Sequence, residues 1–250
     1  MNTLMKEYNF FCAMPRAGST LLSSLINQNP KICLTANSVL PDVLFQILNI
    51  KHQDIFKNFP DKKSIHNLSN RVFDNYYKNW KASTIIDKGP WGTPGNLMSL
   101  KTNFKKPKFI VLYRPVLECL ASFVKADKPT NINEYCDQRM SLNGRIGKEL
   151  WSIKNLIETK QNCHILTYKK LIKNPNKEIK RICKFLKIDF FKVNTKKFKQ
   201  LKINGVVYND SYLNSSLHRI RLGSIKANST IVKKILPKYI LEKYSKLDVI

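Results

Sequence analysis

The sequence predicts an α/β protein of three layers, in which a central parallel sheet is flanked by helices. Short apolar runs rich in β-branched and aromatic residues alternate with amphipathic, helix-like segments over the 250 residues. One run, Lys108–Tyr113, has no polar residue in its interior, which is typical of a parallel strand buried on both faces. Neither a Gly/Ser/Pro-rich linker nor an internal repeat divides the chain, so we expect one domain over residues 1–250.

The order of the expected elements follows from these patterns. Strands are expected at Tyr8–Ala13, Thr84–Asp87, Lys108–Tyr113 and His164–Tyr168. Helices are expected at Ser19–Asn29, Pro41–His52, Ser64–Lys81, Asn96–Asn103, Pro115–Lys125, Asn133–Thr159, Asn176–Lys187 and from Pro237 onward. Ligands of open α/β sheets bind at the carboxyl ends of the strands, so the residues after each strand are the first candidates for a site.

The segment after the first strand is predicted to form a tight turn and then a helix N-terminus that carries hydroxyl groups. Backbone N–H groups in the first turn of a helix have no partner inside the helix and lie at the positive end of its dipole, so they favour an anion such as phosphate. Glycine in the turn permits close approach of that anion. An ordinary Ser-capped helix after a buried strand is the other interpretation. The residues of this loop are Pro15, Arg16, Ala17, Gly18, Ser19 and Thr20.

This loop departs from the nucleotide-binding loop that reads Gly, four residues, Gly, Lys, then Ser or Thr. Ala13 stands at the position of the first Gly, and Ser19 stands at the position of the Lys. Without that Lys the loop is poorly equipped for the β- and γ-phosphates of ATP or GTP. A ligand with a single 5′-phosphate, close to Arg16 in the turn, fits better.

A second anion site is predicted at the end of the run Lys108–Tyr113. Arg114 follows the strand, Pro115 opens a helix at its first position, and Ser122 comes eight residues after the Arg. At this spacing Ser122 lies about two turns up the helix, where it leans over the ligand that Arg114 contacts. The other interpretation is a helix cap and a packing Ser.

These two segments resemble the donor-binding motifs of the sulfotransferase family. In that family the first loop reads Pro, Lys or Arg, Ser or Ala, Gly, then two Ser or Thr residues, and the second motif places a Ser after an Arg-(Asp/Asn)-Pro sequence. The second motif here lacks the residue between Arg and Pro. The resemblance implies a P-loop-like fold and the donor 3′-phosphoadenosine 5′-phosphosulfate (PAPS), with the 5′-phosphosulfate at the loop and the 3′-phosphate at Arg114 and Ser122. Arg16 is closer to the carbohydrate and tyrosyl-protein members than to the cytosolic small-molecule members, which use Lys.

Two further segments resemble the family less closely. Cys163–Pro175 is similar to a strand followed by Tyr-Glu-Asp-Leu and Asn-Pro, and this similarity implies that Tyr168 lies under the adenosine; a Tyr that closes a strand against the core is the alternative. Near the C-terminus, Arg221 and Gly223 match the family's Arg-Lys-Gly loop over the 3′-phosphate, although a solvated basic loop explains them equally well.

The resemblance also implies which residues act in catalysis. Sulfuryl transfer builds negative charge on the bridging oxygen of the departing nucleotide, so fixed cations at that oxygen are the main requirement. Arg16 supplies one, and Lys88, in the turn after the predicted strand at 84–87, matches the catalytic Lys of the family; a solvated loop Lys is the alternative. The His and Glu bases of other members have no counterpart here. Asp42 is the first candidate for the base, before His52 and Asp87, each of which has a structural interpretation as well.

The amino-acid composition bears on which ligands and partners are expected. Lys and Arg number 44 against 17 Asp and Glu, a formal charge of +27, which suits a polyanionic ligand or reflects a Lys- and Asn-rich composition. No repeated basic motif interleaved with aromatics occurs, so nucleic acid is not the expected partner. The alternatives are a P-loop nucleotide or small-molecule kinase and, from another class, a basic nucleic-acid-binding protein. The acceptor stays open among carbohydrate, peptide and small molecule.

The cysteines and the apolar runs bear on the compartment. None of the six cysteines forms a Cys-x-x-Cys pair, so they are expected to be reduced core residues and not a disulfide framework or zinc site. No carboxylate cluster for a divalent metal is evident, and no metal is expected. No apolar run approaches the length of a membrane span, and the first strand begins too early for a signal peptide, so a soluble, cytoplasmic protein is expected.

Overall fold

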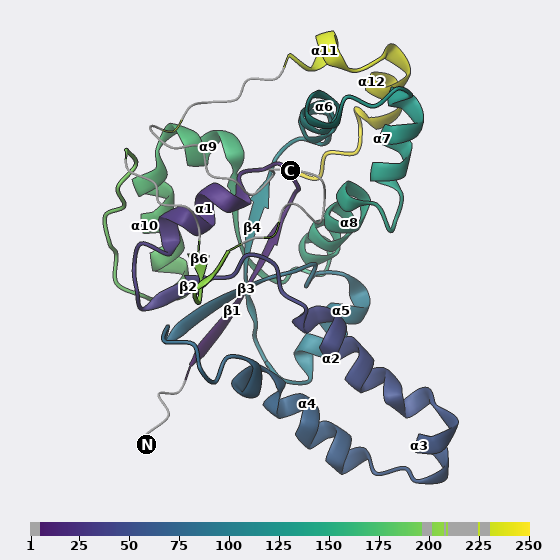
Figure 1. The fold of residues 1–250 in the computed structure, drawn as a ribbon, viewed down its shortest axis with the longest axis vertical. Coiled ribbons are helices and arrows are strands. Elements are labelled where there is room, and N and C mark those ends of the chain that lie inside the picture. The colour runs from purple at the N-terminus through teal and green to yellow at the C-terminus, as the bar shows by residue number, and fades with distance from the viewer. Residues whose placement is uncertain (1–5, 197–201, 208, 210–224, 226–230) are drawn as a thin grey trace.

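A computed structural model describes residues 6–196, 202–207, 209, 225 and 231–250. Five parallel strands form the central sheet, in the order β2-β3-β1-β4-β5. Their bounds are β1 Glu7–Ala13, β2 Ile32–Leu34, β3 Thr84–Lys88, β4 Lys108–Tyr113 and β5 Asn162–Thr167. Helices cover both faces of the sheet (Figure 1). The predicted class, a three-layer α/β fold with a parallel sheet, is confirmed.

The helices and a small hairpin complete the described chain. The helices are α1 Ser19–Ile26, α2 Leu40–Asn49, α3 Asp54–Asn58, α4 Lys62–Tyr76, α5 Pro94–Lys101, α6 Val116–Asp127, α7 Ile132–Met140, α8 Arg145–Glu158, α9 Tyr168–Lys173, α10 Pro175–Leu186, α11 Val232–Ile235 and α12 Lys238–Tyr244. A 3-10 turn, Ile50–His52, follows α2, and β6 Lys202–Ile203 pairs antiparallel with β7 Val206–Val207. Within the described residues no helix has the length and apolar character to cross a membrane.

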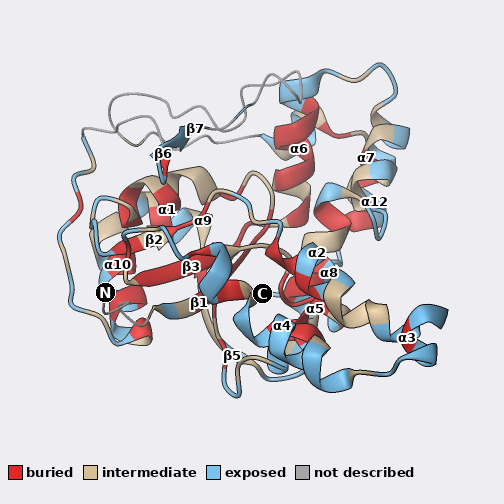
Figure 2. Cartoon of the chain, turned by 60° about the horizontal axis from the view of Figure 1, so that its bottom comes forward, coloured by how far each residue is buried: buried red, intermediate tan, exposed pale blue. Residues whose placement is uncertain are grey.

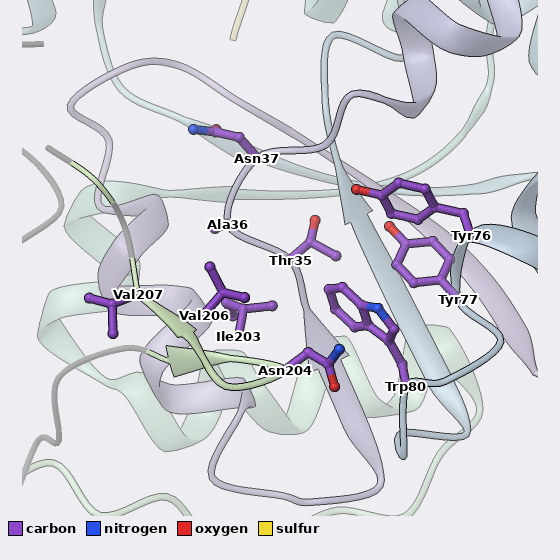
Figure 3. Close-up of a pocket in the computed structure, with 10 residues that line it drawn as sticks. All are labelled: Thr35, Ala36, Asn37, Tyr76, Tyr77, Trp80, Ile203, Asn204, Val206 and Val207. Carbon is purple, nitrogen blue, oxygen red and sulfur yellow. The ribbon is translucent and has the colours of Figure 1, made fainter. Parts of the chain in front are cut away.

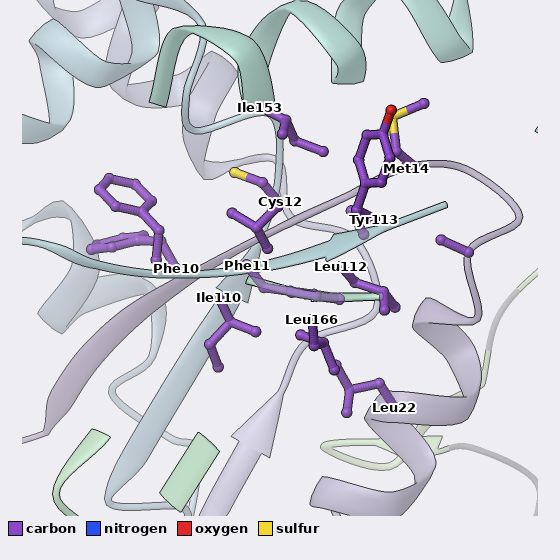
Figure 4. Close-up of a cluster of buried hydrophobic side chains, with 14 of the residues drawn as sticks. Phe10, Phe11, Cys12, Met14, Leu22, Ile110, Leu112, Tyr113, Ile153 and Leu166 are labelled. Atoms are coloured by element: carbon purple, nitrogen blue, oxygen red, sulfur yellow. The ribbon is translucent and has the colours of Figure 1, made fainter. Parts of the chain in front are cut away.

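The strands form the core because they are apolar on both faces. Phe10, Phe11 and Cys12 of β1 are fully buried, and β4 is buried along nearly its whole length (Figure 2). Side chains alternate between the two faces, so Cys12 lies under Ile153 of α8 while Leu22 of α1 packs on the opposite face (Figure 4). By contrast, α2, α3 and α4 extend away from the sheet (Figure 1).

The register of the sheet gathers the strand ends at one edge. The partners across the sheet are Phe11 and Lys88, Ala13 and Leu112, and Tyr113 and Thr167. Four strands therefore end within about two residues of one another, and the segments that follow them converge.

The longest expected helix differs most from the structure. The predicted helix Asn133–Thr159 is two helices, α7 and α8, separated by a turn in which the Gly144 N–H donates to the Ser141 carbonyl over 2.8 Å. A Cβ at Gly144 would lie 2.3 Å from the Gln138 carbonyl oxygen, so only glycine permits the chain to turn back over the end of α7. The short elements β2, α3 and α9 were not expected from the sequence. The expected helix from Ser19 ends three residues earlier than predicted, at Ile26, and the one from Ser64 ends five residues earlier, at Tyr76.

Candidate active site

The loop between β1 and α1 is curled tightly against its neighbours. The Ala17 N–H donates to the Met14 carbonyl over 3.2 Å, and both Arg16 (φ 63°) and Gly18 (φ 89°) adopt left-handed backbone conformations. A Cβ at Gly18 would lie 3.0 Å from Cδ2 of Tyr168, so the loop touches the ring directly. The N-terminus of α1 therefore opens above the sheet edge beside Tyr168, as an anion-binding loop requires.

Arg114 links this loop to the end of β4. Its side chain is buried; Nη1 donates to the Arg16 carbonyl over 2.8 Å and Nε donates to Glu118 over 2.9 Å. The guanidinium carbon lies 4.6 Å from the centroid of the Tyr168 ring. The remaining nitrogen, Nη2, is buried and has no hydrogen-bond partner among the described residues. An unpaired buried donor costs on the order of 1–3 kcal/mol, so this nitrogen is suited to an anionic ligand oxygen.

Ser122 completes the predicted pair of anion sites. It is buried on α6, and its hydroxyl accepts a hydrogen bond from Nε of Arg16 over 3.1 Å. The positions predicted for the 5′-phosphate and for the 3′-phosphate thus belong to one connected cluster, in which Arg16 lies between the two. We call Pro15–Thr20, Arg114, Ser122 and Tyr168 the donor cradle.

Lys88 ends β3 and reaches the donor cradle from the side. Its backbone is fixed, because the Lys88 N–H donates to the Thr35 hydroxyl over 2.8 Å and its carbonyl accepts from the Ser38 N–H over 3.0 Å. Nζ lies 3.3 Å from the hydroxyl of Ser19, the first residue of α1. Burial lowers the pKa of Lys88, and the nearby Glu149 carboxylate opposes that shift. The predicted catalytic Lys is therefore adjacent to the loop.

The predicted base candidates lie in different surroundings. Asp42 is exposed in the first turn of α2, and His52 is exposed at the end of the 3-10 turn. Asp87 is fully buried; it accepts hydrogen bonds from the Tyr77 hydroxyl and from Nε1 of Trp91, the latter over 2.9 Å. Burial raises the pKa of Asp87 to about 6, although these hydrogen bonds oppose the shift. Asp87 therefore has a structural role, because it accepts hydrogen bonds from two aromatic side chains in the core. The role of Asp42 as a base stays a prediction.

Glu149 is a residue of the site that the sequence pattern did not predict. This residue lies on α8, and its charge interacts with Lys88. Burial raises the pKa of Glu149, and Lys88 and Lys148 oppose the shift. The only sequence signal was an acidic residue inside an amphipathic helix, which usually indicates a solvated face.

The predicted C-terminal loop and the question of a metal site remain to be compared with the structure. Arg221 and Gly223 lie outside the described residues. No cluster of three His, Cys, Asp or Glu side chains suited to a metal ion occurs in the part of the chain that the structure describes.

A cavity of about 280 Å³ lies beside the edge strand β2 and not in the donor cradle (Figure 3). Tyr76, Tyr77 and Trp80 form one wall, and the hairpin of β6 and β7 forms the other. Thr35, which also accepts the Lys88 N–H, lines the cavity and separates it from the cradle.

Comparison with known proteins agrees with this geometry. The model of the sulfotransferase family matches residues 10–192. Among curated proteins none matches significantly. The sulfotransferase domain of the Synechococcus PCC 7002 olefin synthase is similar, with a TM-score of 0.59 and 16% identity over 99% of this chain and 95% of that one. The sulfotransferase domain of the curacin biosynthetic pathway gives 0.57 and 16% over 99% and 93%. Mouse sulfotransferase SULT7A1, solved in complex with PAP, gives 0.51 and 14% over 98% and 85%.

Proposed function

We propose that this chain, which belongs to the sulfotransferase family, transfers a sulfuryl group from PAPS to an acceptor hydroxyl or amine. The family and the shared fold make it a sulfotransferase enzyme; the donor and the acceptor are the proposal. The observation that carries the proposal is the donor cradle, where Arg114 keeps a buried, unpartnered nitrogen beside Arg16 and Ser122.

The donor cradle offers a separate contact to each part of such a nucleotide. Backbone amides of the loop and the hydroxyls of Ser19 and Thr20 would hold the 5′-phosphosulfate at the start of α1. Arg114 and Ser122 would hold the 3′-phosphate, and the Tyr168 ring would lie against the adenosine. That the mouse sulfotransferase was solved with PAP supports this choice of nucleotide.

The residues around the sulfuryl group fit the charge that transfer creates. PAPS supplies the sulfuryl group and a nucleotide leaving group. Lys88 and Arg16 would place positive charge where negative charge grows on the bridging oxygen, and a half-buried cation such as Lys88 acts more strongly there than a fully solvated one.

Two finer assignments extend the proposal. Arg16 in the loop and Lys88 at the end of β3 favour the type that acts on carbohydrates or tyrosyl proteins. All six cysteines are unpaired and four of them are buried, which favours a reducing compartment such as the cytoplasm.

Thermal unfolding in the presence of ligands tests the donor against the two alternatives. A ligand present at 100 times its Kd stabilises the folded state by about 2.7 kcal/mol, which raises the Tm of a chain of this size by about 5–10 °C. We expect that rise with 3′,5′-adenosine bisphosphate (PAP) and none with ATP and Mg²⁺. A rise with ATP and Mg²⁺ alone would support a kinase, and a rise with DNA or RNA alone would support a nucleic-acid-binding protein.

A further inference from the structure

Helix α8 is fixed to the turn that follows Lys88. The Gly92 N–H donates to the Ser152 hydroxyl over 2.9 Å, and Nδ2 of Asn155 donates to the Gly92 carbonyl over 2.7 Å. Ser152 also reaches Cys12 of β1, at 3.8 Å between Oγ and Sγ. Glu149 lies one turn before Ser152 on the same face of α8, so these contacts direct its side chain toward the carboxyl edge of the sheet.

The Glu149 carboxylate is partly enclosed by the protein. Oε2 is buried and has no hydrogen-bond partner among the described residues. Glu149 as a whole is half-buried, so its side chain keeps some accessible surface even though Oε2 has none. A buried carboxylate oxygen without a donor is costly, so its retention calls for a ligand or a reacting group that supplies the donor.

The titratable groups that face Glu149 come from three elements. The Lys88 ammonium approaches from β3 and the Lys148 ammonium from α8 itself, while the Cys12 thiol on β1 is neutral because burial raises its pKa. Lys88 and Glu149 form no ion pair within 4.0 Å, so the two side chains influence each other only through their charges. In an in-line transfer the leaving oxygen and the attacking oxygen lie on opposite sides of the sulfur atom. A cation is needed at the leaving oxygen and a base at the attacking oxygen, and the separation of Lys88 from Glu149 suits these two positions.

We propose that Glu149 is the general base that removes the proton from the acceptor hydroxyl. This inference rests on the proposed function. The acceptor O–H bond breaks and its proton passes to the Glu149 carboxylate while the acceptor oxygen forms a bond to sulfur. The bond between sulfur and the 5′-phosphate oxygen breaks, and its electron pair leaves with the nucleotide, beside Lys88.

The electrostatics of the residue agree with this role. Burial shifts the pKa of Glu149 upward, toward the range in which a carboxylate is both ionised and basic enough to take a proton at neutral pH. Asp42 is exposed, and Asp87 already accepts hydrogen bonds from Tyr77 and Trp91, so neither combines access with burial in this way.

The first test compares Glu149→Gln with the matched variant Glu158→Gln, at an exposed residue of the same helix that pairs with Lys154. The reaction is followed as ³⁵S incorporation from labelled PAPS into the acceptor fraction of a cell extract. For Glu149→Gln we expect a loss of about 10²–10⁴-fold in kcat/KM and loss of the acidic limb of the pH–rate profile. PAP affinity, measured by calorimetry, should stay within about threefold of the wild type, because the proposed role is toward the acceptor. An unchanged rate, a retained acidic limb or a loss of about tenfold or more in PAP affinity would overturn the proposal.

A second test needs no turnover. A carboxyl whose pKa is raised by folding makes the protein less stable as the pH rises from its unfolded pKa, about 4.3, through its folded pKa. Asp87 contributes a loss of the same sign, so we expect thermal unfolding of the wild type and of Glu158→Gln to show the full loss and Glu149→Gln to show a smaller one. Parallel pH dependence in all three proteins would contradict the burial on which the proposal depends. If the wild type fails to bind PAP, the proposed function fails; if it binds PAP and transfers sulfur while Glu149→Gln behaves like the wild type, only this inference fails.

Discussion

Replacing Arg114 by Ala should weaken binding of PAP far more than binding of adenosine 5′-monophosphate. The two nucleotides differ in the 3′-phosphate, which is the group assigned to Arg114. A hydrogen bond to a charged group is worth about 1.5–3 kcal/mol, and each 1.4 kcal/mol is tenfold in Kd, so PAP should lose about 10–150-fold in affinity. The unpartnered Nη2 supports the upper part of this range, because the free enzyme gives up no existing bond of that nitrogen when the phosphate binds.

The comparison between two nucleotides separates recognition from structural damage. Arg114 also donates to the Arg16 carbonyl and to Glu118. Its replacement therefore loosens the loop, and this lowers the affinity for both nucleotides by a similar factor. The ratio of the two Kd values, measured by calorimetry, isolates the 3′-phosphate. Arg181→Ala, which breaks an ion pair with Glu178 on α10, is the matched control and should leave the ratio unchanged. Equal losses for both nucleotides in Arg114→Ala would refute the assignment.

Three further predictions concern the loop and the core. Arg16→Ala should lower turnover strongly while the free energy of unfolding changes little, since the side chain faces the donor and Ser122; wild-type turnover in the folded variant would refute this. Gly18→Ala should lower the free energy of unfolding by about 1–2 kcal/mol, because φ is 89° at this position. The clash of the new Cβ with Tyr168 should also weaken PAP binding. Denaturant unfolding measures the first effect and calorimetry the second, and unchanged values would refute the loop geometry. Because burial raises the pKa of Asp87 from 3.8 to about 6, its ionised form costs stability as the pH rises through that window. Asp87→Asn should therefore remove on the order of 2–3 kcal/mol of pH dependence in urea unfolding, and an unaltered dependence would show that the carboxyl is not buried.

The donor cradle could be predicted because its parts are local in the sequence. Each anion-binding element is a strand followed directly by a turn and a helix, and parallel strands bring such turns to the same edge. The alternation of strands and helices was thus enough to predict that Arg16 and Arg114 lie at the carboxyl ends of strands of the same sheet. Their direct contact, through the Arg16 carbonyl, depends on the left-handed conformations in the loop, which the sequence indicated only at Gly18.

Glu149 could not be predicted because tertiary contacts place it. Helical periodicity continues from α7 into α8, so the expected helix ran through the turn at Gly144 and gave no reason to single out Glu149. The position of α8 depends on hydrogen bonds from Ser152 and Asn155 to Gly92, about 60 residues earlier in the chain. Two glycines close together, Gly144 and Gly147, were the available sign that the helix was interrupted.

The most direct test of sulfuryl transfer is the rate of ³⁵S transfer from labelled PAPS in the presence of cell extract, for the wild type and Lys88→Ala, beside calorimetric binding of PAP to both. The wild type should label an acceptor. Lys88→Ala should bind PAP with nearly unchanged affinity but transfer about 10²–10³-fold more slowly, because Lys88 acts on charge that appears mainly in the transition state. A wild-type enzyme that binds PAP but labels nothing, or a Lys88→Ala variant that transfers at the wild-type rate, would contradict the account.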